Sequence, residues 1–158
     1  MTKQDIQFMQ RAIQWAQKGV EAPGGGPFGA VIVKDGEIIA EGHNLVVGTN
    51  DPTAHAEMVV IREACQKLNS YQLEGCIIYT STEPCPMCFG AIYWSRPDKV
   101  FYACDNWDAA QAGFDDRFIY KELEKPMEDR KIPFEQIMRE EGVKVFEEWG
   151  RKDDRPTY

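Results

Sequence analysis

The stretch that decides the fold is Cys76-Ile77-Ile78-Tyr79-Thr80-Ser81-Thr82-Glu83-Pro84-Cys85-Pro86-Met87-Cys88. Its first five residues form a continuous β-rich run, which is typical of a buried strand. The second proline suits the first position of a helix, so the sequence predicts a helix from Cys85 to Trp94 with Cys85 as its N-cap. Cys88 then lies one turn further along, and both sulfurs face one point.

The segments on either side repeat this alternation. Helix-forming residues dominate 53–68, ahead of the strand, and residues 99–103 read Lys-Val-Phe-Tyr-Ala, a second short strand after the helix. The order helix, strand, helix, strand predicts parallel strands joined by helices, so the fold class is α/β.

The N-terminal part of the chain predicts a helix followed by a hairpin. Ile6, Met9, Ile13 and Ala16 recur at helical spacing, with Thr2 and Asp5 as a capping arrangement and Gly19 as the end of the helix. Residues 28–33 and 38–40 then read as antiparallel strands around a tight Asp35-Gly36 turn.

The last third of the chain is less regular. Its patterns indicate a helix over 117–124, a strand over 132–137 behind Pro133, and another helix over 142–150. No repeat or linker divides the 158 residues, which is close to the ~150 residues of one ordinary domain. We therefore expect one domain with a detached tail.

Charge and composition exclude several classes of protein. The chain has 18 basic and 26 acidic residues and a formal net charge of −8, without the basic face that a nucleic-acid-binding protein needs. No apolar run approaches the ~18 residues of a membrane span, and the N-terminus lacks the pattern of a signal peptide. The odd number of cysteines, five, suits a reducing compartment, so we expect a cytoplasmic protein with no nucleic-acid or membrane partner.

A second motif makes the Cys85/Cys88 pair more specific. Thr53-Ala54-His55-Ala56-Glu57 stands at the start of the preceding helix. Residues two apart point about 200° away from each other on a helix, so His55 and Glu57 can meet only over its N-terminal end. The open ends of helices that follow parallel strands lie at one edge of the sheet. His55, Cys85 and Cys88 can therefore converge on one ion.

The number of ligands distinguishes a catalytic zinc site from a structural one. A structural site has four protein ligands, whereas a catalytic site leaves one position for water. The motif supplies three, and neither His43 nor the remaining cysteines stand in ligand spacing. We expect one zinc ion per chain with water at the fourth position, and Glu57 as a nearby carboxylate that is not a ligand.

Taken together, these motifs resemble the cytidine-deaminase-like superfamily and, within it, the bacterial guanine deaminases. His-x-Glu with Pro-Cys-x-x-Cys is the zinc deaminase signature. The resemblance also rests on Gly25-Gly26-Pro27-Phe28-Gly29-Ala30, Asp51-Pro52, Glu83, Gly90-Ala91-Ile92-Tyr93-Trp94, Ala112-Gly113-Phe114-Asp115-Asp116 and Tyr158.

The resemblance implies a three-layer α/β/α fold with a five-stranded mixed sheet between helices. It implies zinc-dependent hydrolysis of guanine to xanthine and ammonia, in which zinc-bound hydroxide attacks C2. The implied zinc ligands are His55, Cys85 and Cys88. The implied catalytic residues are Glu57, as proton shuttle, and Asp116. The implied substrate-binding residues are Phe28, Asn44, Ala56, Trp94 and Tyr158.

The resemblance further implies a homodimer. In such a dimer the C-terminal segments, about residues 130–158, are exchanged, so that Tyr158 of one subunit closes the pocket of the other. Residues 140–156 match no part of the family pattern.

Several alternatives stay open at this point. Cytosine deaminases and tRNA adenosine deaminases share the zinc motif. A thioredoxin-like protein would use Cys85 and Cys88 as a dithiol but leaves His55 and Glu57 unexplained, and a structural zinc module lacks a fourth ligand. Phe28 and Trp94 can be core aromatics, Asp115 and Asp116 can cap a helix, and Cys65, Cys76 and Cys104 are expected to be buried.

Overall fold

The computed structural model describes residues 1–157, so Tyr158 lies outside the described residues. The chain forms two compact units, Met1–Asp116 and Arg117–Tyr158, which are described separately. The first unit contains, in chain order, α1 (Lys3–Glu21), β1 (Gly29–Lys34), β2 (Glu37–His43), α2 (Val46–Thr49), α3 (Ala56–Leu68), β3 (Cys76–Thr82), α4 (Pro86–Ser95), β4 (Lys99–Cys104) and α5 (Asn106–Gln111).

The sheet of the first unit has the strand order β2-β1-β3-β4. β1 runs antiparallel to both β2 and β3, while β3 and β4 run parallel around the crossover helix α4. Asp35 and Gly36 both have positive φ angles, of 52° and 81°, as the predicted tight hairpin turn between β1 and β2 requires. The predicted α/β class and mixed sheet are confirmed.

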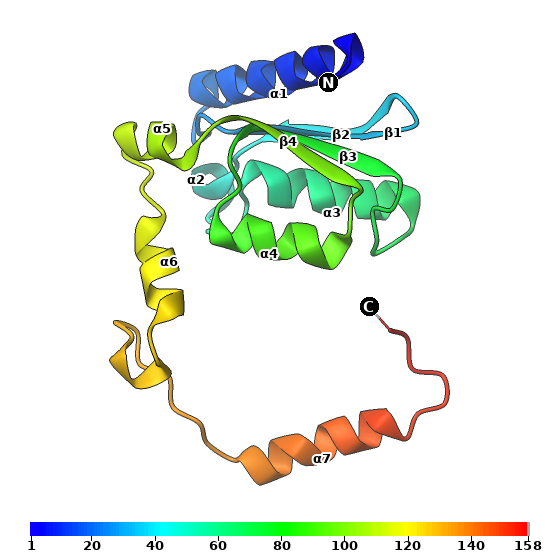
Figure 1. The fold of residues 1–158 in the computed structure, drawn as a ribbon, viewed down its shortest axis with the longest axis vertical. Helices are drawn as coiled ribbons and strands as arrows, with labels where there is room; N and C mark the ends of the chain where they lie inside the picture. Colours follow the sequence, from blue (N-terminus) through cyan, green and yellow to red (C-terminus); the bar gives the residue numbers. More distant parts are fainter. Residues whose placement is uncertain (158) are drawn as a thin grey trace. The chain divides into compact units, whose positions relative to one another are not determined.

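Helices cover both faces of this sheet (Figure 1). On one face, α3 and α4 enclose a core that includes Ile32, Val60 and Ile78, and on the other face α1 packs against Val31 and Tyr79. Successive residues of β1 thus face opposite helical layers, which explains why this strand is apolar up to its last residue, Lys34. The arrangement is the expected three-layer α/β/α architecture.

Two details of α1 differ from the sequence-based prediction. Thr2 and Asp5 do form a capping box, but Ile6 and Ile13 are exposed, and Phe8, Ala12 and Trp15 pack towards the sheet instead. Phe8 and Trp15 bury more apolar area against the sheet than Ile6 and Ile13 would. The two aromatic side chains therefore set the orientation of the helix.

Gly19 does not end α1, which continues to Glu21. A Cβ atom at Gly19 would lie 2.1 Å from the carbonyl oxygen of Gly26. This glycine therefore permits the close approach of the following loop, and the helix ends two residues later, at Glu21, with Ala22 as its C-cap.

The second unit contains α6 (Arg117–Glu124), the 3-10 helix η1 (Met127–Asp129) and α7 (Arg139–Gly150). The predicted helices over 117–124 and 142–150 are confirmed, but the predicted strand over 132–137 is wrong: these residues form no strand. The described part of the chain therefore has four strands rather than the five expected. A single segment cannot satisfy its backbone N–H and C=O groups as a strand without a neighbouring strand, and this unit contains no sheet among its described residues.

All five cysteines are free. Cys76 is buried and Cys65 half-buried, but the expectation of burial is wrong for Cys104, which is exposed because β4 is the edge strand of the sheet. Within residues 1–157, none of the helices combines the length and the apolar character that crossing a lipid bilayer requires.

Candidate metal centre and active site

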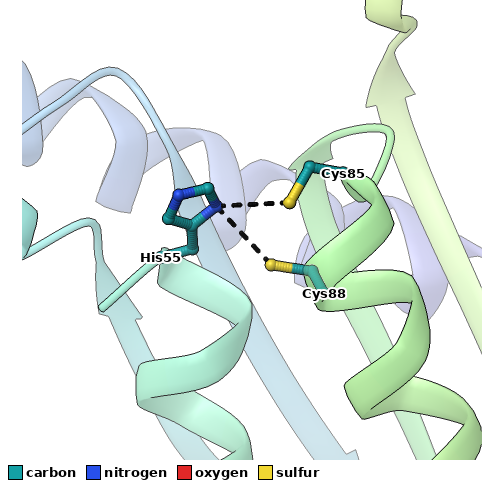
Figure 2. Close-up of side chains that lie close together, drawn as sticks. All are labelled: His55, Cys85 and Cys88. Carbon is teal, nitrogen blue, oxygen red and sulfur yellow. Dashed lines mark hydrogen bonds between the residues drawn. The ribbon is translucent and has the colours of Figure 1, made fainter. Parts of the chain in front are cut away.

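Three predicted ligands meet where α3 and α4 begin. His55 is the N-cap of α3, Cys85 is the N-cap of α4, and Cys88 lies in the first turn of α4. Figure 2 shows the imidazole of His55 and the two thiols pointing towards one another. The ligand atoms of all three residues lie within 4.8 Å of one another. The three side chains therefore converge over two helix N-termini, as the sequence predicts.

The spacing of these atoms fits one tetrahedral zinc ion. Nδ1 of His55 lies 3.5 Å from Sγ of Cys85 and 3.6 Å from Sγ of Cys88. With Zn–N bonds of about 2.0–2.1 Å and Zn–S bonds of about 2.3 Å, tetrahedral geometry places nitrogen and sulfur ligands about 3.6 Å apart. One nitrogen and two sulfur donors are also the set that zinc prefers.

Without metal, the two thiols are electrostatically unequal. Hydrogen bonds from Cys88 and from His55 lower the pKa of Cys85 to about 4, against the opposing effect of burial. Donation to Cys85 together with burial raises the pKa of Cys88, and the hydrogen bond with Cys85 raises that of His55. The lowered pKa of Cys85, the helix N-cap, favours a negative charge at a place where the helix dipole also favours an anion.

Glu57 lies beside the three ligands. It occupies the first turn of α3 and is 6% exposed. Its Oε2 lies 3.5 Å from Sγ of Cys88. Burial raises the pKa of Glu57, while a hydrogen bond from its own backbone opposes that shift. A buried carboxylate at the edge of a metal site, with a raised pKa, is suited to proton transfer.

Phe28 and Asn44 form a second group at the ends of the hairpin strands. The backbone N–H of Asn44 donates to the carbonyl of Phe28 at 3.0 Å, and Oδ1 of Asn44 accepts from the backbone of Val46 at 3.1 Å. The Phe28 ring meets Phe114 edge to face, with centroids 4.9 Å apart. Phe28 is half-buried, so it is neither a fully buried core residue nor a surface one. The segment over 112–116 is thereby held against the start of β1.

Asp116 ends this segment and has an unusual environment. Its Oδ1 is buried and has no hydrogen-bond partner among residues 1–157. Burial, followed by the charge on Cys85, raises the pKa of Asp116. Such an unpaired buried acceptor is costly unless a ligand satisfies it. Asp116 is therefore within electrostatic reach of the metal-binding cysteines.

The other predicted site residues occupy different surroundings. Ala56 is fully buried at the first position of α3, next to His55. Trp94 is 65% exposed near the C-terminal end of α4, whereas the cysteines lie at the N-terminal end of that helix. Tyr158 lies outside the described residues. Of the predicted pocket, the structure brings together Phe28 and Asn44, and it places Trp94 at the end of α4 opposite the two cysteines.

Sequence reasoning missed one residue that contacts this site. Thr80 on β3 is 2% exposed, and its hydroxyl donates to Oε1 of Glu57 at 3.3 Å. The available signal was the change from apolar residues to three hydroxyl residues, Thr80 to Thr82, at the end of an otherwise apolar strand. The pattern alone could not reveal which of the three faces the site.

Known proteins resemble this chain in sequence and fold. Residues 2–104 match the family model for the cytidine and deoxycytidylate deaminase zinc-binding region. The chain is 59% identical over 151 residues to the guanine deaminase of Bacillus subtilis (strain 168), across 96% of this chain and 97% of that one. It is 39% identical over 145 residues to the tRNA-specific adenosine deaminase of Aquifex aeolicus (strain VF5), across 92% and 93% of the two chains.

The X-ray structure of the guanine deaminase from Bacillus subtilis matches with a TM-score of 0.95 and 57% identity, over 100% of this chain and 99% of that one. The family model covers the whole of α3, β3 and α4, and therefore all three candidate zinc ligands and Glu57. The chain belongs to the cytidine and deoxycytidylate deaminase family, whose zinc-binding region its residues 2–104 contain.

Proposed function

We propose that the protein is a zinc-dependent guanine deaminase, which hydrolyses guanine to xanthine and ammonia. The observation that carries this proposal is the 59% identity to a guanine deaminase along 96% of the chain, together with the convergence of His55, Cys85 and Cys88. The identity supports the substrate, and the donor set supports hydrolytic deamination.

His55, Cys85 and Cys88 hold one zinc ion through Nδ1 and the two Sγ atoms. When bound, zinc acidifies water and so supplies the nucleophile for hydrolysis at neutral pH. The chain contributes the geometry: both cysteines and the histidine stand on helix N-termini, where backbone N–H groups favour thiolate. Three protein ligands leave one tetrahedral position for the reaction.

Glu57 carries the protons. Its Oε2 lies on the Cys88 side, at 3.5 Å from the sulfur, and so adjoins the reaction position. The carboxylate takes one proton from the attacking water and passes it to the ring nitrogen. It then takes the second proton from the hydroxyl now on C2 and delivers it to the departing amine, so that C2 becomes a carbonyl and ammonia leaves. Burial raises the pKa of Glu57, which makes its carboxylate a stronger base for taking up these protons.

Guanine lies against the group formed by Phe28, Asn44 and the loop that carries Asp116. The flat face of Phe28 stacks on the purine, and Trp94 offers a second exposed aromatic face. Asn44 binds a polar edge of the base. The backbone N–H of Ala56, the first residue of α3, has no acceptor within the helix and donates to the base. The unpaired Oδ1 of Asp116 accepts from guanine N–H groups and assists catalysis.

The protein acts as a homodimer of single-domain chains in which residues 130–158 are exchanged, so that Tyr158 closes the site of the partner. Support comes from the second unit itself, which leaves Ile132, Ile137 and Phe146 more than 70% exposed. Apolar surface of this kind favours burial against another chain. The reaction belongs to purine catabolism in the cytoplasm, a reducing compartment in which five free cysteines persist.

A second candidate is deamination of adenosine in tRNA, favoured by the 39% identity to a tRNA-specific adenosine deaminase. The formal net charge of −8 disfavours it, because binding to tRNA relies on neutralising phosphates.

Incubation of the purified protein with guanine tests the proposal. We expect ammonia and xanthine in equal amounts, measured by a coupled ammonia assay and by chromatography. A parallel incubation with tRNA should yield no inosine. Absence of xanthine, or inosine as the faster product, would overturn guanine as the substrate.

A further inference from the structure

One buried hydroxyl, that of Thr80, lies on a face of the sheet that is otherwise apolar. Cys76, Ile78 and Thr80 alternate along β3 and so point to the same side, on which Cys76 and Ile78 pack with Val60 of α3. Thr80 is nearly as buried as they are, at 2% exposed. A polar group at such a depth is costly unless it is hydrogen-bonded.

The hydroxyl of Thr80 has two partners. Its Oγ1 lies 3.3 Å from Oε1 of Glu57 and 3.0 Å from the carbonyl oxygen of Thr82, so its one hydroxyl hydrogen is shared between these two acceptors. β3 is a central strand, paired with β1 on one side and β4 on the other, so the position of this hydroxyl is fixed by two ladders. Thr80 is therefore a rigid anchor for the more flexible glutamate side chain.

The two oxygens of Glu57 consequently have different surroundings. Oε1 faces Thr80, whereas Oε2 lies 3.5 Å from Sγ of Cys88, on the side of the metal site. The contact with Thr80 opposes rotation of the carboxylate about its terminal bond. Glu57 thus presents one defined oxygen to the reacting groups.

We infer that Thr80 is a positioning residue for the deamination reaction: its hydroxyl holds Oε1 of Glu57, so that Oε2 is the atom that carries the proton. This inference rests on the proposed function, since it takes Glu57 as the proton carrier. A displacement of about 1 Å in a catalytic group can cost about 10²-fold in rate. Loss of the hydroxyl should therefore lower kcat while leaving metal binding and substrate binding intact.

The test compares Thr80→Val with Thr80→Ser in the zinc-loaded protein. Valine keeps the shape of threonine without the hydroxyl, and serine keeps the hydroxyl. Ser81→Ala is the matched control, because Ser81 is the next residue of β3, is also buried, and its Oγ accepts from the backbone of Gly29 at 3.0 Å rather than from Glu57. Zinc content, thermal melting, kcat and KM are measured for each, with guanine or whichever free base the wild type deaminates.

We expect Thr80→Val to keep one zinc per chain and its KM, and to lose about 10- to 100-fold in kcat. Thr80→Ser should recover most of that loss, and Ser81→Ala should lose stability but little kcat. Unchanged kcat in Thr80→Val, or loss of its zinc, would overturn the inference. A wild type that deaminates another base but not guanine would overturn the proposed substrate alone.

A second readout needs no substrate. In protein labelled with ¹³C at the glutamate carboxyl carbons, the Glu57 signal is identified by its absence in Glu57→Gln. We expect Thr80→Val to shift this signal, and Thr80→Ser to restore it. A Glu57 signal that is the same in wild type and Thr80→Val would overturn the contact itself, whatever the enzyme deaminates.

Discussion

The two units of this chain differ in how they obtain a stable interior. Every buried residue of the described chain lies in Met1–Asp116, whereas none of residues 117–157 is buried. The family model ends at residue 104, so the zinc-binding region falls within the unit that has its own core. The difference shows that the reacting groups stand on a unit with its own core, while the second unit leaves its large apolar side chains exposed.

The largest effect should come from removing a metal ligand of the first unit. We expect Cys88→Ser to lose most of its zinc and with it nearly all activity, because the ion would keep only two strong protein ligands. Elemental analysis of protein purified without added metal measures this. Cys104→Ser, which changes an exposed thiol, is the matched control and should keep its zinc. Full zinc occupancy in Cys88→Ser would exclude Cys88 as a ligand.

The next effect concerns the proton carrier of the same unit. Glu57→Gln should retain zinc and fold but lose about 10²- to 10⁴-fold in kcat, the usual contribution of general acid-base catalysis. Glu63→Gln on the same helix changes a half-exposed carboxylate paired with Lys67 and should leave kcat unchanged. Loss of zinc from Glu57→Gln would mean that Glu57 is itself a ligand.

Mixing two inactive variants tests the role of the tail. A chain that lacks residues 130–158 should be inactive alone, as should full-length Cys88→Ser. After subunit exchange, a mixed dimer with swapped tails has one intact site that receives one intact tail, so about a quarter of wild-type activity should return. If activity stays absent although mixed dimers are present, the tail closes the site of its own chain.

The smallest effect should come from the residue at the junction of the two units. Asp116→Asn should keep zinc and lower kcat/KM for guanine by about 10- to 100-fold, since a hydrogen bond to a charged group contributes about 1.5–3 kcal/mol. Asp115→Asn is the neighbouring control, expected to retain most activity. Equal losses in both variants would point to the loop as a whole instead of to Asp116.

Local patterns predicted the elements whose formation depends on neighbouring residues. The Asp35-Gly36 turn, the capping box of Thr2 and Asp5, and Cys85 as the N-cap of α4 all arise from chemistry within four residues. The metal centre was predictable because it lies at two helix N-termini, whose places follow from the alternation of helices and strands.

Features that depend on distant partners could not be predicted in this way. The contact of Thr80 with Glu57 joins residues 23 apart in sequence, so no local pattern contains it. Residues 132–137 have the composition of a strand but lack a neighbouring strand, and Cys104 has apolar neighbours but lies on an edge strand. In each case tertiary surroundings outweigh local preference.

The most direct test of the central claim is a set of kcat/KM values for guanine, cytosine, adenine, cytidine and guanosine, measured on the zinc-loaded protein. A site that binds several polar edges of its substrate can reject an analogue that lacks one by about 10⁴-fold. We expect kcat/KM for guanine to exceed that for every other compound by a wide margin. A value for cytosine equal to or above that for guanine would contradict it.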